Sequence, residues 1–143
     1  MRHPICTIGY EGKSLESLFE SLKAAGVTCL VDVRIRPQSR KPGFSKSSLA
    51  ENCSEHGIDY VHRRDLGTPE YIMKQLRETG VYNWEAYSKH LSSEKEALQW
   101  LTEVCQNKVS CLLCFEREAA DCHRKIIADE VASSLGATVK HLQ

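Results

Sequence analysis

Short apolar runs alternate along the chain with longer segments in which apolar residues recur every three or four positions. The longer segments predict helices, because a 3.6-residue period places their apolar side chains on one face; they cover residues 14–25, 47–56, 69–77, 93–105 and 121–135. The short runs predict β-strands at residues 5–8, 27–33, 58–61, 109–114 and 137–142.

This alternation predicts an α/β fold, with a mostly parallel five-stranded sheet flanked by helices in a Rossmann-like three-layer arrangement. The run Val27–Val33 is almost continuously apolar, which is typical of a strand covered on both faces. A length of 143 residues suits one domain, so we expect a single α/β domain over residues 1–143. Residues 67–92 are the least regular, and we expect them to form an irregular flap over one edge of the sheet.

Composition narrows the possible partners. The 19 basic and 19 acidic residues cancel, so attraction to an anion must come from local clustering of charge. The chain has seven cysteines but no long apolar run at its start, which predicts a cytoplasmic protein with mostly free thiols. No segment approaches the roughly 20 apolar residues of a membrane span, so we expect no membrane partner.

A basic loop follows the second predicted strand. Five basic residues and no acidic one lie between Arg34 and Lys46. Ligands of open α/β sheets bind outside the carboxyl ends of the strands, and an arginine fork can bond two oxygens at once. We therefore expect Arg34, Arg36, Ser39 and Arg40 to bind a phosphate or another anion; a solvated basic loop is the alternative.

Two polar residues near strand ends border the same crevice. Asp32 lies inside the apolar second strand, where a charge is costly unless it is paired. Its structural interpretation is a buried partner of Arg34, and its functional interpretation is a general base or a substrate contact. Tyr10 follows the first strand and is expected to close the other side of the crevice.

The stretch from Cys114 to Arg124 is the richest in reactive side chains. Cys122 and His123 are predicted in the first turn of a helix capped by Asp121, and Glu116 directly follows the fourth strand. Cys122 is interpreted as a nucleophile, as a metal ligand with Cys114 and His123, or as a packing residue beneath the helix. Zinc ligands usually pair at shorter spacings, so we expect neither a metal nor a cofactor. The candidate catalytic residues are Glu116, Cys122 and His123, with Arg124 contacting the substrate.

Several motifs together resemble a known family. They are Thr7-Ile-Gly-Tyr-Glu11, Leu30-Val-Asp-Val-Arg34, Leu112-Leu-Cys-Phe-Glu116 and Cys122-His-Arg124, in this order. The set resembles the domain-of-unknown-function 488 family, found mainly in bacteria and archaea, in which many members have serine where this chain has Glu11. The resemblance implies an α/β sheet with the site at one end, formed by Gly9, Tyr10, Asp32, Arg34, Pro37, Ser39, Arg40, Glu116, Cys122, His123 and Arg124.

Three functional classes are compatible with this sequence. The leading hypothesis is a protein that binds or acts on a phosphate-bearing ligand, either a nucleotide or a nucleic acid. The first alternative is a thiol-dependent enzyme for sulfur transfer or redox chemistry that uses Cys122. The second alternative is a non-catalytic nucleic-acid-binding module, in which Tyr82, Trp84 and Tyr87 offer stacking surfaces beside the basic loop. Whether the chain is an enzyme stays open at this level.

Overall fold

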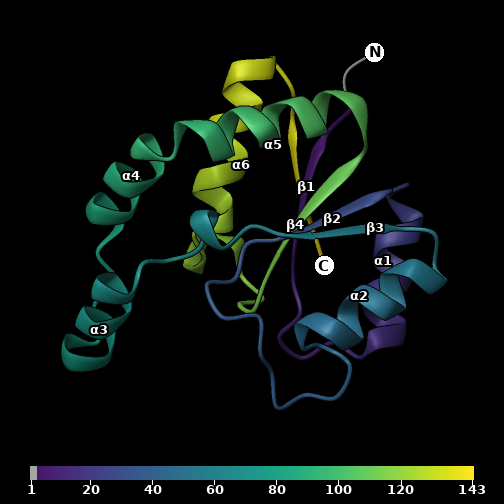
Figure 1. Ribbon diagram of the computed structural model, residues 1–143, viewed down its shortest axis with the longest axis horizontal. Coiled ribbons are helices and arrows are strands. Elements are labelled where there is room, and N and C mark those ends of the chain that lie inside the picture. The colour runs from purple at the N-terminus through teal and green to yellow at the C-terminus, as the bar shows by residue number, and fades with distance from the viewer. Residues whose placement is uncertain (1–2) are drawn as a thin grey trace.

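Five parallel strands form the centre of the computed structural model, which describes residues 3–143 (Figure 1). The strands lie in the order β3-β2-β4-β1-β5, and every neighbouring pair is parallel. The predicted α/β class is confirmed, and the sheet is entirely parallel. The strands are β1 (Ile5–Gly9), β2 (Cys29–Asp32), β3 (Asp59–His62), β4 (Ser110–Cys114) and β5 (Val139–Leu142).

Helices cover both faces of this sheet, which confirms the three-layer arrangement (Figure 1). On one face, apolar side chains of α1 and α2 pack against Cys6, Ile8 and Leu30. On the other face, α4, α5 and α6 pack against Val31 and Leu112. The helices are α1 (Leu15–Ala24), α2 (Lys46–Glu55), α3 (Glu70–Thr79), α4 (Trp84–Ser93), α5 (Lys95–Asn107) and α6 (Arg124–Leu135), with short 3-10 turns at Arg64–Leu66 and Ala119–Asp121.

The strand order creates a crevice between β1 and β4. These two strands are neighbours, but the helix after β1 (α1) covers one face of the sheet and the helix after β4 (α6) covers the other. The two connections therefore diverge at the carboxyl ends of β1 and β4. This divergence is the topological switch point at which open α/β sheets bind their ligands.

The segment 67–92 is more regular than the sequence predicts, because it contains most of α4 as well as α3, and α3 matches the helix predicted over residues 69–77. Gly80 has a left-handed conformation that ends α3, and the Asn83 side chain caps α4 by accepting from the Ala86 N–H. Tyr87 is fully buried and donates a hydrogen bond to the Leu66 carbonyl. Tyr87 thus lies on the buried side of α4, and α3 and α4 extend beyond the sheet (Figure 1).

Two predicted helix starts also differ from the structure. Ser93 does not cap α5; it is the last residue of α4, and its hydroxyl donates to the His90 carbonyl. Asp121 does not cap α6 either, because it ends a 3-10 turn in which the Cys122 N–H donates to the Ala119 carbonyl. Cys122 and His123 therefore lie between the 3-10 turn and α6, which begins at Arg124.

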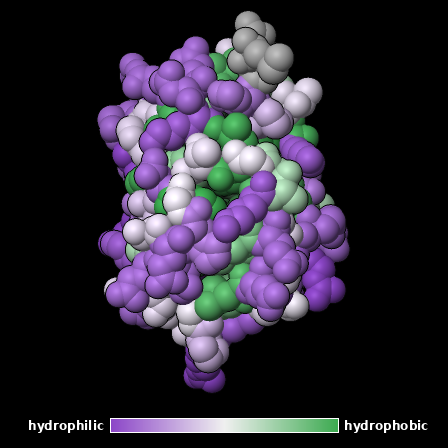
Figure 2. All heavy atoms as spheres, turned by 90° about the vertical axis from the view of Figure 1, so that its right-hand side faces the viewer, coloured by the Kyte–Doolittle hydropathy of each residue, from purple (hydrophilic) through white to green (hydrophobic). Residues whose placement is uncertain are grey.

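Among the described residues, no helix combines the length and the apolar character needed to cross a bilayer. Polar and charged atoms cover most of the face on the side of α1 and α2, with hydrophobic atoms confined to a narrow central band (Figure 2). All seven cysteines are buried and free, so the expectation of free thiols is confirmed.

Candidate functional site

A cavity of about 520 Å³ lies at the switch point, at the carboxyl end of the sheet. Its walls come from the segments after β1, β2 and β4, closed on a further side by α3 and the segment that follows it. Arg34 and His123, about ninety positions apart in the sequence, both line this cavity. The chemically relevant residues of the wall are Tyr10, Arg34, Arg36, Gln38, Ser39, Thr68, Tyr82, Cys114, Glu116, Cys122 and His123.

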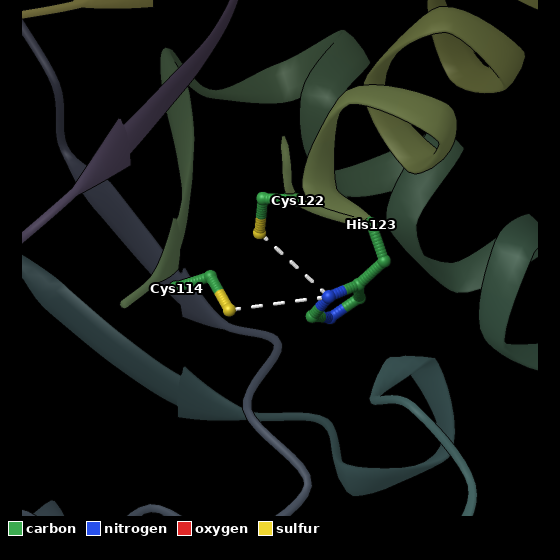
Figure 3. Close-up of side chains that lie close together, drawn as sticks. All are labelled: Cys114, Cys122 and His123. Atoms are coloured by element: carbon green, nitrogen blue, oxygen red, sulfur yellow. Dashed lines mark hydrogen bonds between the residues drawn. The ribbon is translucent and has the colours of Figure 1, made fainter. Parts of the chain in front are cut away.

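Cys114, Cys122 and His123 form a compact cluster in this wall (Figure 3). Both sulfurs face His123 Nδ1, at 3.9 Å from Cys114 Sγ and 3.7 Å from Cys122 Sγ. Cys114 ends β4, whereas Cys122 and His123 directly precede α6. All three side chains are at most 6% exposed, so the cavity is the route by which a small molecule reaches them.

The other ring nitrogen of His123 fixes the orientation of the imidazole. His123 Nε2 lies 2.9 Å from the carbonyl oxygen of Val33, which directly follows β2. A carbonyl only accepts hydrogen bonds, so Nε2 carries a proton and donates it. Nδ1 therefore faces the two sulfurs either as a bare lone pair or, in the imidazolium form, as a second donor.

The cluster shifts the pKa of each of its members. A hydrogen bond from the Cys114 thiol outweighs burial and, together with contacts from His123, lowers the pKa of Cys122 to about 3. The hydrogen bond to Cys122 and burial both raise the pKa of Cys114 well above its usual value. Burial alone lowers the pKa of His123, but its hydrogen bond to Cys122 gives a net rise. In the absence of other ligands, the electrostatics favour a Cys122 thiolate beside a neutral Cys114 thiol.

Glu116 lies beside the cluster, with Oε2 3.5 Å from Cys114 Sγ. Burial and the nearby Cys122 raise the pKa of this carboxyl. Glu116 is held in place through its backbone, because a Cβ on Gly9 would meet the Glu116 carbonyl oxygen at 1.7 Å. Only glycine at the end of β1 leaves room for the chain after β4 to cross there.

Asp32 is fully buried and forms the predicted ion pair with Arg34. Its carboxylate accepts from Arg34 Nε at 2.8 Å and Nη2 at 2.7 Å, and also from the Tyr60 hydroxyl. Arg34 also donates to Tyr10 and to the Phe44 carbonyl. Burial alone disfavours the guanidinium charge, but the hydrogen bonds to Asp32 raise the pKa of Arg34 above its usual value. This network fixes Arg34 at the cavity wall and neutralises its charge locally.

Two of the arginines expected in the crevice are placed elsewhere. Arg40 is exposed and lies outside the residues that line the cavity. Arg124 is buried, and its guanidinium donates to the carbonyls of Glu116 and Arg117 instead of facing a ligand. Its role is to hold the chain after β4, and the cavity is less basic than the sequence predicts. Arg36 does reach the cavity, where it forms an exposed ion pair with Glu70.

The sequence analysis missed the wall that α3 and the following segment supply. Met73, Leu76, Tyr82 and Thr68 line the cavity, and the Tyr82 hydroxyl lies 2.7 Å from Thr68 Oγ1. The sequence does contain a pattern that indicates this wall, because Met73 and Leu76 lie three positions apart on one face of a helix. The helix itself was predicted over residues 69–77, but it was not placed at the crevice.

Comparisons with known proteins agree with the motifs. Residues 14–131 match the family described as "Domain of unknown function DUF488". The match covers most of the chain, including Asp32, Arg34 and the complete Cys114–His123 segment. It confirms the resemblance inferred from the motifs. A search of curated proteins gives no match.

Proposed function

The chain belongs to the DUF488 family, and on that premise we propose that its cavity binds a phosphate-bearing small ligand of about nucleotide size. The observation that carries this proposal is the position of the cavity, which brings the donors of the loop after β2 to the same space as the Cys114–Cys122–His123 cluster. Its volume of about 520 Å³ falls within the range of small-molecule sites, roughly 300–1,000 Å³.

Arg36 is the side chain best suited to bind the phosphate. The Arg36 side chain is 68% exposed, and the side chain of its ion-pair partner Glu70 is 51% exposed. Exposed pairs of this kind contribute little to stability, so a ligand phosphate can replace Glu70 at small cost. Bidentate hydrogen bonds from arginine to phosphate are stronger than this surface pair.

Arg34 supports the phosphate in a different way. Hydrogen bonds to Asp32, Tyr10 and the Phe44 carbonyl engage its guanidinium, and the Tyr60 hydroxyl adds a further contact, so Arg34 forms a fixed part of the cavity wall. Asp32 holds this guanidinium in a fixed position, so little side-chain entropy is lost when a ligand binds beside it. Gln38 and Ser39 line the same side of the cavity and add neutral polar groups.

The opposite wall determines what can happen to the bound ligand. Glu116, Cys122 and His123 supply a carboxylate, a thiolate and an imidazole within one wall of the cavity. Phe115 is 47% exposed and lies at the same site, where a flat base can stack on its ring. This combination supports a ligand with an aromatic base at one end and a phosphate at the other.

The two alternative functions have less support. Thiol chemistry at Cys122 gains from the contact with His123, but a side chain only 2% exposed is closed to a protein or nucleic-acid substrate. A nucleic-acid-binding module needs a continuous basic surface, whereas Arg34 and Arg124 are engaged within the protein and the net charge is zero.

Calorimetric titration with AMP and with adenosine tests the proposed function. We expect AMP to bind and adenosine, which lacks the phosphate, to bind at least tenfold more weakly, which corresponds to about 1.4 kcal/mol. Arg36→Ala should weaken AMP binding by a similar factor, because it removes a charge-assisted hydrogen bond. Arg40→Ala is the matched control, since Arg40 is an exposed arginine of the same loop outside the cavity.

Two results would contradict this proposal. The first is equal affinity for AMP and adenosine, and the second is an equal loss of AMP affinity in the Arg36 and Arg40 variants. A short oligonucleotide that binds far more tightly than AMP, with a steep loss of affinity in salt, would instead favour the nucleic-acid-binding module.

A further inference from the structure

The Cys114–Cys122–His123 cluster has the composition and shape of a metal site. We propose that these three side chains bind one Zn²⁺ ion and leave its fourth coordination position open to the cavity. The three potential ligand atoms lie within 4.8 Å of one another, and the two cysteine side chains approach the His123 ring from β4 and from the connection before α6 (Figure 3).

The distances agree with tetrahedral zinc. Zinc binds thiolate sulfur at about 2.3 Å and imidazole nitrogen at about 2.0 Å, so a sulfur and a nitrogen on one tetrahedral ion are about 3.6 Å apart. The two sulfur-to-Nδ1 distances here are 3.7 Å and 3.9 Å. Small side-chain adjustments are therefore enough to close the cluster around an ion.

The hydrogen bond from His123 to Val33 is the second observation that favours a metal. Histidines that bind metals usually donate their other ring N–H to a carbonyl or carboxylate, which orients the ring and fixes its tautomer. His123 Nε2 makes this bond to the Val33 carbonyl at 2.9 Å. The tautomer that results presents the Nδ1 lone pair to both sulfurs, which is the arrangement that a metal ion requires.

Charge and ligand type select zinc among the common metals. Two cysteine sulfurs with one imidazole form a soft ligand set, which suits zinc and does not suit magnesium or calcium. Two thiolates also neutralise the double charge of the ion, so the buried site carries no net charge.

Three protein ligands distinguish this site from a structural zinc site. Structural sites usually have four protein ligands, whereas catalytic sites have three and keep one position for water or substrate. All three ligand residues line the cavity, so the open position is accessible from it. Glu116 lines the same wall, where its carboxylate can accept a hydrogen bond from a zinc-bound water.

An open fourth coordination position would let the zinc ion contact the phosphate-bearing ligand. Zinc can act as a Lewis acid on a phosphoryl oxygen that takes its fourth position. This role rests on the proposed binding of a phosphate-bearing ligand, whereas zinc binding stands without it. The short-spacing rule that disfavoured a metal applies to ligands on one loop, but here Cys114 comes from the end of β4, and Cys122 and His123 come from the connection that precedes α6.

Metal analysis of the purified protein tests the site. We expect about one zinc per chain after growth with zinc, bound with at least hundredfold lower affinity in Cys122→Ala, since loss of even an outer-shell partner costs about 10–100-fold. Cys105→Ala is the matched control, because Cys105 is equally buried but packs between α5 and the sheet. Equal zinc affinity in the two variants would overturn the assignment.

Cobalt substitution decides the question even if the cysteine variants fail to fold. The wild-type protein, stripped with a chelator and loaded with Co²⁺, should show intense thiolate-to-cobalt charge transfer and the visible bands of a tetrahedral ion. Zinc should also protect Cys122 from iodoacetamide. If these bands are absent and Cys122 reacts equally fast with and without zinc, the metal site is overturned and Cys122 is a reactive thiolate instead. Calorimetry with AMP on the zinc-free protein separates this result from a failure of ligand binding.

Discussion

The buried pair Asp32–Arg34 shows at the residue scale how much a single sequence position can reveal. A carboxylate between Val31 and Val33 requires a partner, and the arginine two positions later was the natural choice. The same reasoning failed for Arg124, because its partners are the carbonyls of Glu116 and Arg117. Backbone acceptors carry no sequence signature, so their positions appear only once the chain is folded.

Replacing Asp32 with asparagine should destabilise the protein strongly. Asp32→Asn keeps the size of the side chain but leaves the Arg34 charge buried and uncompensated, which costs about 3–5 kcal/mol. Urea unfolding would measure this loss. Asp65→Asn is the control, because Asp65 is 36% exposed in its pair with Arg63 and should cost about 1 kcal/mol or less. Equal losses in the two variants would contradict a structural role for the buried pair.

At the scale of elements, the strands were predicted better than the helix ends. Apolar runs identify strands reliably in a parallel sheet because both faces are covered. The helix start at Asp121 was wrong because the N–H of Cys122 closes a 3-10 turn that a capping pattern does not reveal. That error matters for the site, since it places Cys122 and His123 in the connection before α6 and not within the helix.

Gly9 at the end of β1 lies against the backbone of Glu116, which follows β4, and this close contact gives a prediction. In Gly9→Ala, the new Cβ would overlap the Glu116 carbonyl, so one of the two backbones must shift, at a cost of about 1–3 kcal/mol. We expect weaker AMP binding as well, because Glu116 and Cys114 move with this backbone. Gly26→Ala is the control: no atom lies within 4 Å of its Cβ, but its positive φ carries a cost of about 1–2 kcal/mol. Unchanged AMP affinity in Gly9→Ala would refute the proposed link between this contact and the cavity.

At the scale of the whole molecule, the strand order explains why the site lies where it does. The order β3-β2-β4-β1-β5 places the ends of β2, β4 and β1 side by side, so residues far apart in sequence share one cavity. The sequence predicted the segments that converge, because their polar residues follow apolar strands. It did not predict the weak positive charge of the cavity, since the partners of Arg34 and Arg124 depend on tertiary contacts.

A crystal structure of the zinc-loaded protein grown with phosphate would test the central claim most directly. Anomalous scattering should place one zinc between Cys114, Cys122 and His123, at about 2.3 Å from each sulfur and about 2.0 Å from Nδ1. Phosphate should lie in the cavity between this ion and Arg36. Zinc and phosphate bound only elsewhere, such as the groove lined by His62 and Arg64, would contradict the account.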